Sequence, residues 1–297
     1  MLTYIEFKEK VRNEFKNYLN LDYKNYIIKI EAVKKVNETL DALLIADENK
    51  KDCAVPTFYI NDMYSDYIKS KDYQFIFEKT ADAFDKAMKN SDRIKMSVDI
   101  SNFKGKIVFQ VINTKENEEL LKTLPHRDFL DLSIIYRYLI NKDIKAGIMS
   151  AVITESLQKL IGISEEELYE EAFENTRKIN PVMVKTILEA LSGFMGKEVK
   201  ETGMPDMYVI SNDIGINGAN TILYNDIFKE LSKKVKGDLF ILPSSINELI
   251  AVPANIGDAE SLRKMVYTIN REQVKKSEWL SDNVYRYSVN MDRGEIG

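Results

Sequence analysis

Residues 26–46 read YIIKIEAVKKVNETLDALLIA, and this stretch decides the fold class. Two runs, Tyr26–Val33 and Leu40–Ala46, are rich in the side chains that favour strands, and the polar pair Asn37-Glu38 separates them. The pattern predicts a β-hairpin. The segments on either side of it, Thr3–Leu19 and Tyr73–Met88, carry apolar residues at helical spacing. Hairpins mixed with helices predict an α+β fold with mixed, largely antiparallel sheets, and not a doubly wound parallel sheet.

The rest of the chain continues this mixture. Thr3 with Glu6 and Ser164 with Glu167 have the spacing of capping boxes, which predicts that helices begin at those points. Further strands are expected at Lys106–Ile112, Ala146–Ile153, Met207–Ser211, Ala219–Tyr224, Asp238–Leu242 and Glu248–Val252. Further helices are expected at Phe129–Ile140, Asp226–Val235 and Ala259–Arg271, and Asn61-Asp62 are expected to cap another helix.

Two short signals fix the expected geometry around residues 180–220. Asn180-Pro181 predicts an N-cap followed by proline in the first turn of a helix. That helix would bury apolar side chains at Val184, Ile187, Leu188, Leu191, Phe194 and Met195. Asn217-Gly218 is a strong hairpin signal and predicts a tight turn between two strands.

The stretch Gly196–Pro205 is polar and rich in helix breakers, which makes it the best candidate for a boundary. We therefore expect an N-terminal α+β lobe at residues 1–196 and a C-terminal lobe of order ββαββα at residues 203–297. A single compact unit remains an alternative.

Composition excludes several classes of protein. The 297 residues contain one cysteine, Cys53, and one histidine, His126, so neither an intrachain disulfide nor a zinc site of three or four His and Cys ligands is expected. No signal-peptide pattern and no long apolar run are present, which predicts a cytoplasmic protein without a membrane segment. The net charge of -5 argues against a broad basic face for nucleic acid. No metal and no cofactor are expected.

Several strings, taken in order, resemble an uncharacterised family of bacterial proteins known as a domain of unknown function and common in gut Firmicutes. The strings are Val111–Leu120, Leu124–Leu132, Gly162–Tyr169, Asn217–Tyr224, Asp238–Ser245 and Ser281–Tyr287. The resemblance spans nearly the whole chain. It implies a bacterial cytoplasmic protein, from a phage or another mobile element, and it implies no activity or catalytic residue.

The motifs that carry chemistry are incomplete. His126-Arg127-Asp128 has the letters of a kinase catalytic loop, but the position of the metal-binding asparagine holds Ser133 and no glycine-rich loop occurs. Asp128 is better interpreted as the cap of a following element. Ser244-Ser245 follows a strand without the surroundings of a nucleophile elbow, which indicates a turn. Carboxylates that converge on Mg²⁺, for example near Asp206, stay open as an alternative.

An aromatic cluster that includes Tyr59, Tyr64 and Tyr67 is flanked by lysines and also by aspartates. Such a cluster could stack on bases or contact another protein, and the acidic neighbours favour the protein contact.

These observations favour a non-catalytic cytoplasmic binding protein that acts on a macromolecular partner, in the first place another protein, as a modulator of a host protein. A Mg-dependent enzyme acting on phosphodiesters and a nucleic-acid-binding protein are the alternatives. The oligomeric state is left open. The candidate binding residues are His126, Arg127, Asp128, Asn217, Ser244, Ser245, Glu248, Tyr59, Tyr64 and Tyr67.

Overall fold

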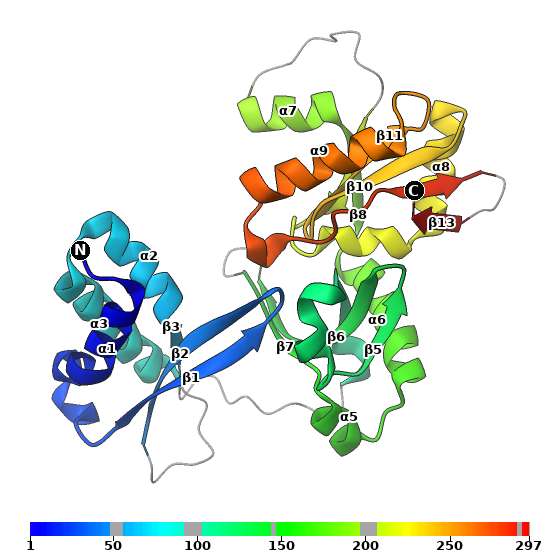
Figure 1. Ribbon diagram of the computed structural model, residues 1–297. Coiled ribbons are helices and arrows are strands. Elements are labelled where there is room, and N and C mark those ends of the chain that lie inside the picture. Colours follow the sequence, from blue (N-terminus) through cyan, green and yellow to red (C-terminus); the bar gives the residue numbers. More distant parts are fainter. Residues whose placement is uncertain (48–55, 92–102, 144–146, 197–206, 290–292, 297) are drawn as a thin grey trace. The chain divides into compact units, whose positions relative to one another are not determined.

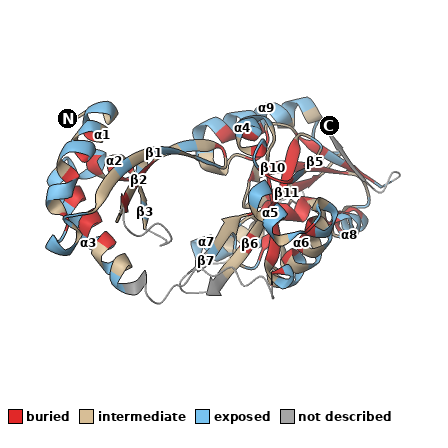
Figure 2. Cartoon of the chain, turned by 90° about the horizontal axis from the view of Figure 1, so that it is seen from below, coloured by how far each residue is buried: buried red, intermediate tan, exposed pale blue. Residues whose placement is uncertain are grey.

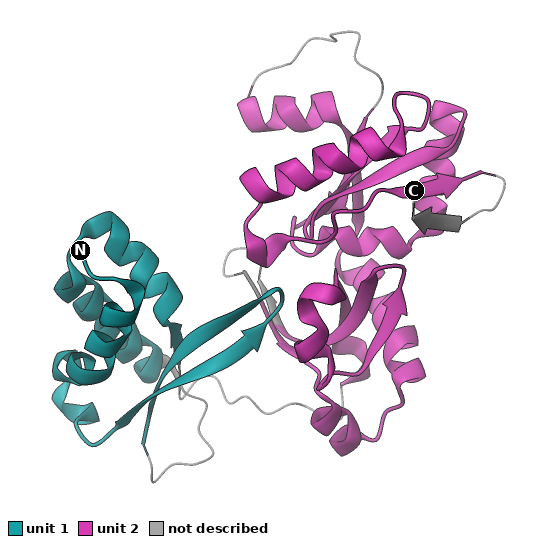
Figure 3. Cartoon of the chain, in the orientation of Figure 1, with its two compact units in different colours: residues 1–98 teal, residues 99–297 magenta. Residues whose placement is uncertain are grey.

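The computed structural model describes residues 1–47, 56–91, 103–143, 147–196, 207–289 and 293–296. The chain divides into two compact units, residues 1–98 and residues 99–297 (Figure 3). The division falls well before the boundary that the sequence suggests at Gly196–Pro205. Strands on either side of that stretch pair with each other, so both belong to unit 2. Every strand pair in the described part of the chain is antiparallel, and helices accompany each sheet, which confirms the α+β class.

Unit 1 packs three helices against a three-stranded sheet of order β1-β2-β3 (Figure 1). The strands are β1 (Ile27–Lys35), β2 (Glu38–Ala46) and β3 (Thr57–Tyr59), and the helices are α1 (Tyr4–Glu14), α2 (Ile60–Ser70) and α3 (Tyr73–Ser91). The predicted hairpin and the predicted capping box of Thr3 with Glu6 are both confirmed. Asn37 supplies the positive φ, 63°, that the hairpin turn needs.

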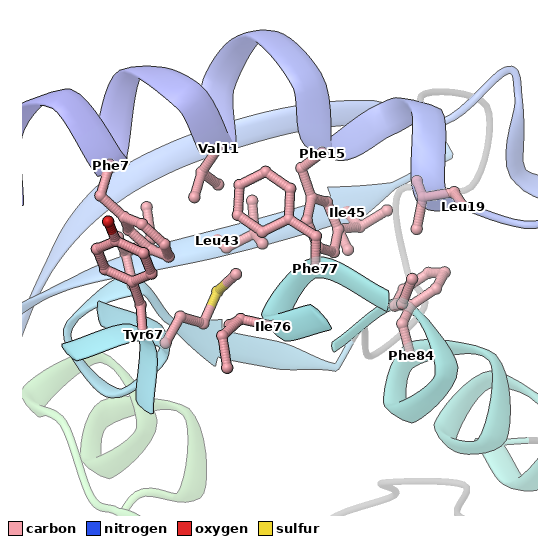
Figure 4. Close-up of a cluster of buried hydrophobic side chains, with 13 residues drawn as sticks. Phe7, Val11, Phe15, Leu19, Leu43, Ile45, Tyr67, Ile76, Phe77 and Phe84 are labelled. Atoms are coloured by element: carbon pink, nitrogen blue, oxygen red, sulfur yellow. The ribbon is translucent and has the colours of Figure 1, made fainter. Parts of the chain in front are cut away.

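The core of unit 1 lies between α1, α2, α3 and β2 (Figure 4). Phe7, Val11 and Phe15 recur every four residues, so they lie on one side of the first helical segment and point at the sheet. Phe77 contacts both Phe7 and Phe15 edge-on, with ring centroids 5.7 and 5.5 Å apart. In Figure 2 these helices are red on the core side and pale blue on the outer side.

One predicted cap in unit 1 is wrong. Helix α2 begins at Ile60, and its N-cap is Tyr59, which has no capping side chain. Asn61 lies inside the helix, where its side-chain oxygen accepts the backbone N–H of Asp41 at 2.9 Å. The amide therefore joins α2 to the neighbouring strand β2 instead of capping its own helix.

Unit 2 contains two sheets. The first has strands β4 (Ile107–Asn113), β5 (His126–Phe129), β6 (Leu132–Asp143) and β7 (Gly147–Val152), with β6 paired to the other three. Its helices are α4 (Glu118–Leu121), α5 (Glu155–Ile161) and α6 (Glu165–Ile179), and α6 packs on β4. The predicted capping box of Ser164 with Glu167 is present at the start of α6.

The second sheet of unit 2 has six strands in the order β13-β12-β10-β11-β9-β8. The strands are β8 (Val182–Thr186), β9 (Tyr208–Asn212), β10 (Leu239–Ser245), β11 (Glu248–Pro253), β12 (Tyr285–Ser288) and β13 (Arg293–Ile296). The helices are α7 (Ile187–Met195), α8 (Asn225–Val235) and α9 (Ala259–Glu272). Phe240, Leu242 and Val252 of this sheet form one core cluster with Val266 of α9.

The helix predicted at Phe129–Ile140 is wrong, because most of this range is the central strand β6. Leu130 takes a positive φ of 57° and turns the chain from β5 into β6. Both faces of β6 are buried from Leu132 to Tyr136, so its apolar run shows no alternation of period two. Without that alternation the run could not be distinguished from a buried helix.

The hairpin predicted at Asn217-Gly218 is also wrong. Asn217 does take a left-handed conformation, φ 53°, but Gly218–Leu223 forms a 3-10 helix, η6, in place of a strand. The backbone N–H of Ala219 donates to the carbonyl of Ile246 at 3.2 Å, in the turn between β10 and β11. The Asn-Gly pair therefore starts η6, and the first residues of η6 contact that turn.

The buried side chain of Asn220 in η6 closes the outer edge of β4. Its Oδ1 accepts the backbone N–H of Val111 at 2.9 Å, and its Nδ2 donates to the carbonyl of Phe109 at 2.8 Å. The N–H of Phe109 donates to the Thr176 hydroxyl of α6 at 3.0 Å. The Asn220 amide thus makes the backbone hydrogen bonds that a neighbouring strand would otherwise make to β4. These bonds also join the two sheets of unit 2.

A second connection between the sheets centres on Asp131, in the turn between β5 and β6. Its carboxylate accepts hydrogen bonds from the Ser281 hydroxyl at 2.6 Å, the Asn283 amide at 2.9 Å and the Tyr285 hydroxyl at 2.8 Å. Burial, and then the charge of Asp131, raise the pKa of Tyr285 well above its ordinary value. The phenol therefore stays protonated and keeps donating to the carboxylate.

Replacing Asn220 should destabilise unit 2. Asn220→Ala leaves two buried backbone groups of β4 without partners, so we expect the free energy of unfolding to fall by about 1–3 kcal/mol. Urea unfolding followed by the fluorescence of Trp279, the single tryptophan, measures this. Asn255→Ala, at an exposed asparagine, is the matched control, and equal midpoints for the two variants would contradict the bridging role.

Unit 1 should lose stability in acid through Asp41. Burial raises the pKa of this carboxyl, but hydrogen bonds from Lys8 and Tyr4 outweigh burial and hold the pKa below its ordinary 3.8. A lowered pKa stabilises the folded state above pH 3.8, and this contribution is lost as the pH falls through the lowered value. At neutral pH we expect Asp41→Asn to cost about 1–3 kcal/mol.

Below pH 3.8 the difference between Asp41→Asn and the unchanged chain should shrink. Hydrogen exchange of peptides from residues 1–47 at several pH values measures it for unit 1. A difference that stays constant down to pH 2 would show that the ion pair is not the cause.

Candidate functional site

His126, Arg127 and Asp128 are successive residues of β5, so their side chains alternate between the two faces of the sheet. They do not converge as a kinase loop would require, and the predicted helix that Asp128 would cap is absent, because Asp128 pairs with Ser133 of β6. The His126 ring contacts the carbonyl of Leu124 through Nδ1 at 2.8 Å.

Arg127 belongs to a network with the first turn of α6. Its guanidinium donates to Glu165 at 2.8 Å and to Glu166 at 2.6 Å, and it stacks on the ring of Tyr169 at 4.0 Å. The Tyr136 hydroxyl donates to Glu165 as well. The hydrogen bond to Glu165 is the main cause that raises the pKa of Arg127. The network fastens β5 to α6 and keeps the arginine charged.

Asn217, Ser244, Ser245 and Glu248 gather around the turn between β10 and β11. The Asn217 N–H donates to Oδ1 of Asn247 at 3.1 Å, and the N–H of Asn247 donates to the Ser245 hydroxyl at 3.0 Å. The Ser244 hydroxyl donates to Glu248 at 3.3 Å. Within the described residues, no hydrogen bond or ion pair connects this group to His126, Arg127 or Asp128, so the predicted surface falls into separate groups.

The tyrosines of the predicted aromatic cluster have different surroundings. Tyr67 is 4% exposed, and its ring stacks on Phe7 with centroids 5.2 Å apart. Its hydroxyl accepts the N–H of Leu2, and the Tyr64 hydroxyl donates to the carbonyl of Leu2. Tyr67 is a core residue and Tyr64 is half-buried against the same core, and both hold the N-terminal segment. Tyr59 is half-buried and lines a surface groove.

Across the ranges that the structure describes, no group of three or more His, Cys, Asp or Glu side chains is placed to hold a metal ion. Cys53 and Asp206 lie outside the described residues. No described helix combines the length and the apolar character needed to cross a bilayer.

A groove of about 480 Å³ follows the outer side of α9 and the loop at Asp282 and Asn283. Beside it, the guanidinium of Arg271 stacks on the rings of Tyr267 and Trp279 at 4.4 and 4.0 Å and pairs with Asp282 through two hydrogen bonds. The Arg271 guanidinium thus contacts two aromatic rings and one carboxylate. These contacts hold the segment at Trp279 and Asp282 against α9.

Helix α7 carries the most unusual surface of unit 2. Thr186 caps its first turn in a capping box with Glu189, and Gly196 ends it with a φ of 63°. The helix is rich in apolar residues, yet none of its residues is buried. Leu191, Phe194 and Met195 are 42%, 91% and 52% exposed, and their spacing of three and four places them on one side of the helix.

Strand β8 directly precedes α7 and contacts it, and among the described strands it ends the six-stranded sheet (Figure 1, where β8 and α7 are light green). Val184 of β8 is exposed, and Lys185 is the charged residue of the strand. Hydrogen bonds from the Thr186 backbone and side chain lower the pKa of Glu189, and the charges of Lys185 and Lys234 lower it further. We define the docking surface as Val184, Leu191, Phe194 and Met195 together with the edge of β8 that pairs with no described strand.

The sequence pattern gave the wrong structure for this surface. Asn180-Pro181 does not start a helix, because Pro181 precedes strand β8 and the helix begins six residues later, at Ile187. Val184, Leu191, Phe194 and Met195, which were expected to be buried, are exposed. The spacing of Thr186 and Glu189 is a capping box, and it was the local signal for the true start.

A comparison with known protein families matches residues 4–289 to the family of unknown function DUF5688. The chain belongs to this family. The match confirms the uncharacterised domain family that the ordered strings indicate. No curated protein and no solved structure matches this family member.

Gly218 should tolerate no side chain, because the turn of β10 and β11 is packed against it. A Cβ there would lie 2.2 Å from the Ser211 hydroxyl and 2.3 Å from the carbonyl of Asn247. We expect Gly218→Ala to lower the free energy of unfolding by about 1–3 kcal/mol. Gly257→Ala, whose nearest neighbour is 4.0 Å away, should be neutral in the same urea titration. Equal effects would show that η6 does not rest on this turn.

Proposed function

We propose that this protein is a non-catalytic binding protein whose partner is another protein, and that the partner docks on the docking surface of unit 2. Two observations carry the proposal: the exposed stripe of Leu191, Phe194 and Met195 on α7, and the edge of the preceding strand β8, with which no further described strand pairs. Exposed apolar side chains in one patch are typical of protein contact sites, and an open strand edge offers backbone hydrogen bonds to a partner.

The chemistry of the docking surface favours a protein over nucleic acid. Nucleic-acid sites combine basic side chains with stacking rings. Here the ring of Phe194 stands among aliphatic side chains, and Lys185 and Glu189 balance each other in charge. An aromatic side chain that can become fully covered is the usual centre of a protein interface.

The bonds of the candidate chemical groups also support binding over catalysis. Arg127 is committed to two glutamates, and Ser245 and Asn217 hold the turn at Asn247. Each of these groups connects elements of the fold. The proposal includes a cytoplasmic partner and the modulation of a host protein by a product of a phage or mobile element, as the family resemblance implies.

Phe194→Asp should remove partner binding without affecting the fold. The side chain is 91% exposed, so the unfolding midpoint should stay unchanged, whereas affinity should fall about 30-fold or more if the ring is the centre of the interface. Affinity capture of the tagged chain from its native cells at two salt concentrations measures this. Phe75→Asp, at another exposed phenylalanine in unit 1, is the matched control.

We expect one protein to be retained at both salt concentrations by the unchanged chain and by Phe75→Asp, and to be lost with Phe194→Asp. Capture of nucleic acid with a steep salt dependence would favour the nucleic-acid alternative. A partner that Phe194→Asp retains would place the interface elsewhere.

A further inference from the structure

A groove of about 300 Å³ in unit 1 lies between strand β3 and helices α2 and α3. It is separate from the docking surface, which belongs to unit 2. Thr57, Phe58 and Tyr59, all the residues of β3, line it. Because successive side chains of a strand point to opposite faces, a groove that touches all three includes the edge of the strand.

The edge of β3 is the next feature of the groove. Within the described residues β3 pairs with β2 alone, and it ends the sheet. An extended peptide can add to such an edge by main-chain hydrogen bonds, while its alternate side chains enter the space between strand and helix. The volume is at the small end of the range for ligand sites, about 300–1,000 Å³, and suits a short segment.

The floor of the groove is apolar. Met63 of α2 and Ile76 of α3 are both buried members of the core cluster of unit 1, and each also lines the groove. Thr80, beside them, already donates its hydroxyl to the carbonyl of Ile76 at 2.8 Å. An aliphatic side chain from a peptide would therefore meet apolar atoms there.

The rim of the groove is acidic. Asp66 and Lys79 pair across it at 2.8 Å, so their charges offset each other. Asp62 is exposed, and within the described part of the chain it has no hydrogen bond and no ion pair. The groove therefore presents one unpaired carboxylate, which complements a lysine or arginine on the bound segment.

We propose that unit 1 binds an extended peptide segment of another protein in this groove, with an aliphatic side chain over Met63 and Ile76 and a basic side chain at Asp62. The segment adds to β3 as a further strand. This site goes beyond the proposed function, because it would recognise a peptide motif independently of the docking surface on unit 2.

The test uses two libraries of capped heptapeptides on the full-length protein. One library has a central lysine and the other a central glutamate, with Val, Ile, Leu or Thr at the remaining positions. We expect the unchanged chain to select members of the lysine library, with affinities about threefold to fivefold higher than those of the matched glutamate peptides in fluorescence polarisation.

Charge reversal at the rim should reverse this preference. Asp62→Lys should weaken the lysine peptides and strengthen the glutamate peptides by similar factors, and Asp62→Asn should abolish the preference. Asp82→Lys, at an exposed aspartate of α3 outside the groove, should leave the preference unchanged. Ala83→Phe fills the groove from an exposed position and should abolish binding of both libraries.

The proposal is wrong if no peptide binds, if lysine and glutamate peptides bind equally well, or if Ala83→Phe leaves binding intact. A dimer that forms with rising concentration and is lost in Ala83→Phe would show that a second copy occupies the groove, which would also overturn the proposal. Phe194→Asp should not change peptide binding, so this test and the test of the docking surface fail independently.

Discussion

The buried edge of β4 that faces away from β6 is the constraint on which unit 2 depends. An edge strand inside a protein must find partners for its backbone groups, and here side chains supply them in place of another strand. Asn220 matches one N–H and one carbonyl of the strand, and Thr176 takes a further N–H. Because these residues come from η6 and α6, closing the edge also holds the two sheets of the unit together. Asp131 adds a second connection between the two sheets, through three side-chain donors from residues 281–285.

Elements with a local cause were predictable from the sequence. The hairpin at residues 27–46, the capping boxes at Thr3 and Ser164, and most helices follow from patterns that span only a few residues. Strand β6 was not predictable, because a strand buried on both faces lacks alternation. Neither was η6, since the turn that holds Gly218 comes from residues about thirty positions later in the sequence. Long-range packing determines the secondary structure of both segments, and a local sequence pattern carries no information about that packing.

Less of the candidate site was predictable. Arg127 and Asn217 were predicted to be binding residues. In the structure each of them connects two elements of the fold. Asn220 connects two of the strings that carry the family resemblance, Val111–Leu120 and Asn217–Tyr224. Asp131 connects two others, Leu124–Leu132 and Ser281–Tyr287. Much of the family resemblance therefore lies where the two sheets of unit 2 meet. Phe194 was missed because apolar periodicity shows that a helix has an apolar side and not whether that side is covered.

Among the described strands, β8 and β13 form the two ends of the six-stranded sheet. If β8 of one molecule joined β13 of the next, the contact would repeat without closing and would build a fibre. Strand β8 has only five residues, follows Pro181 directly and carries Lys185, and short length, proline and lysine are the features by which natural sheets limit such growth. The edge can therefore remain available for a partner while unregulated polymerisation is restrained.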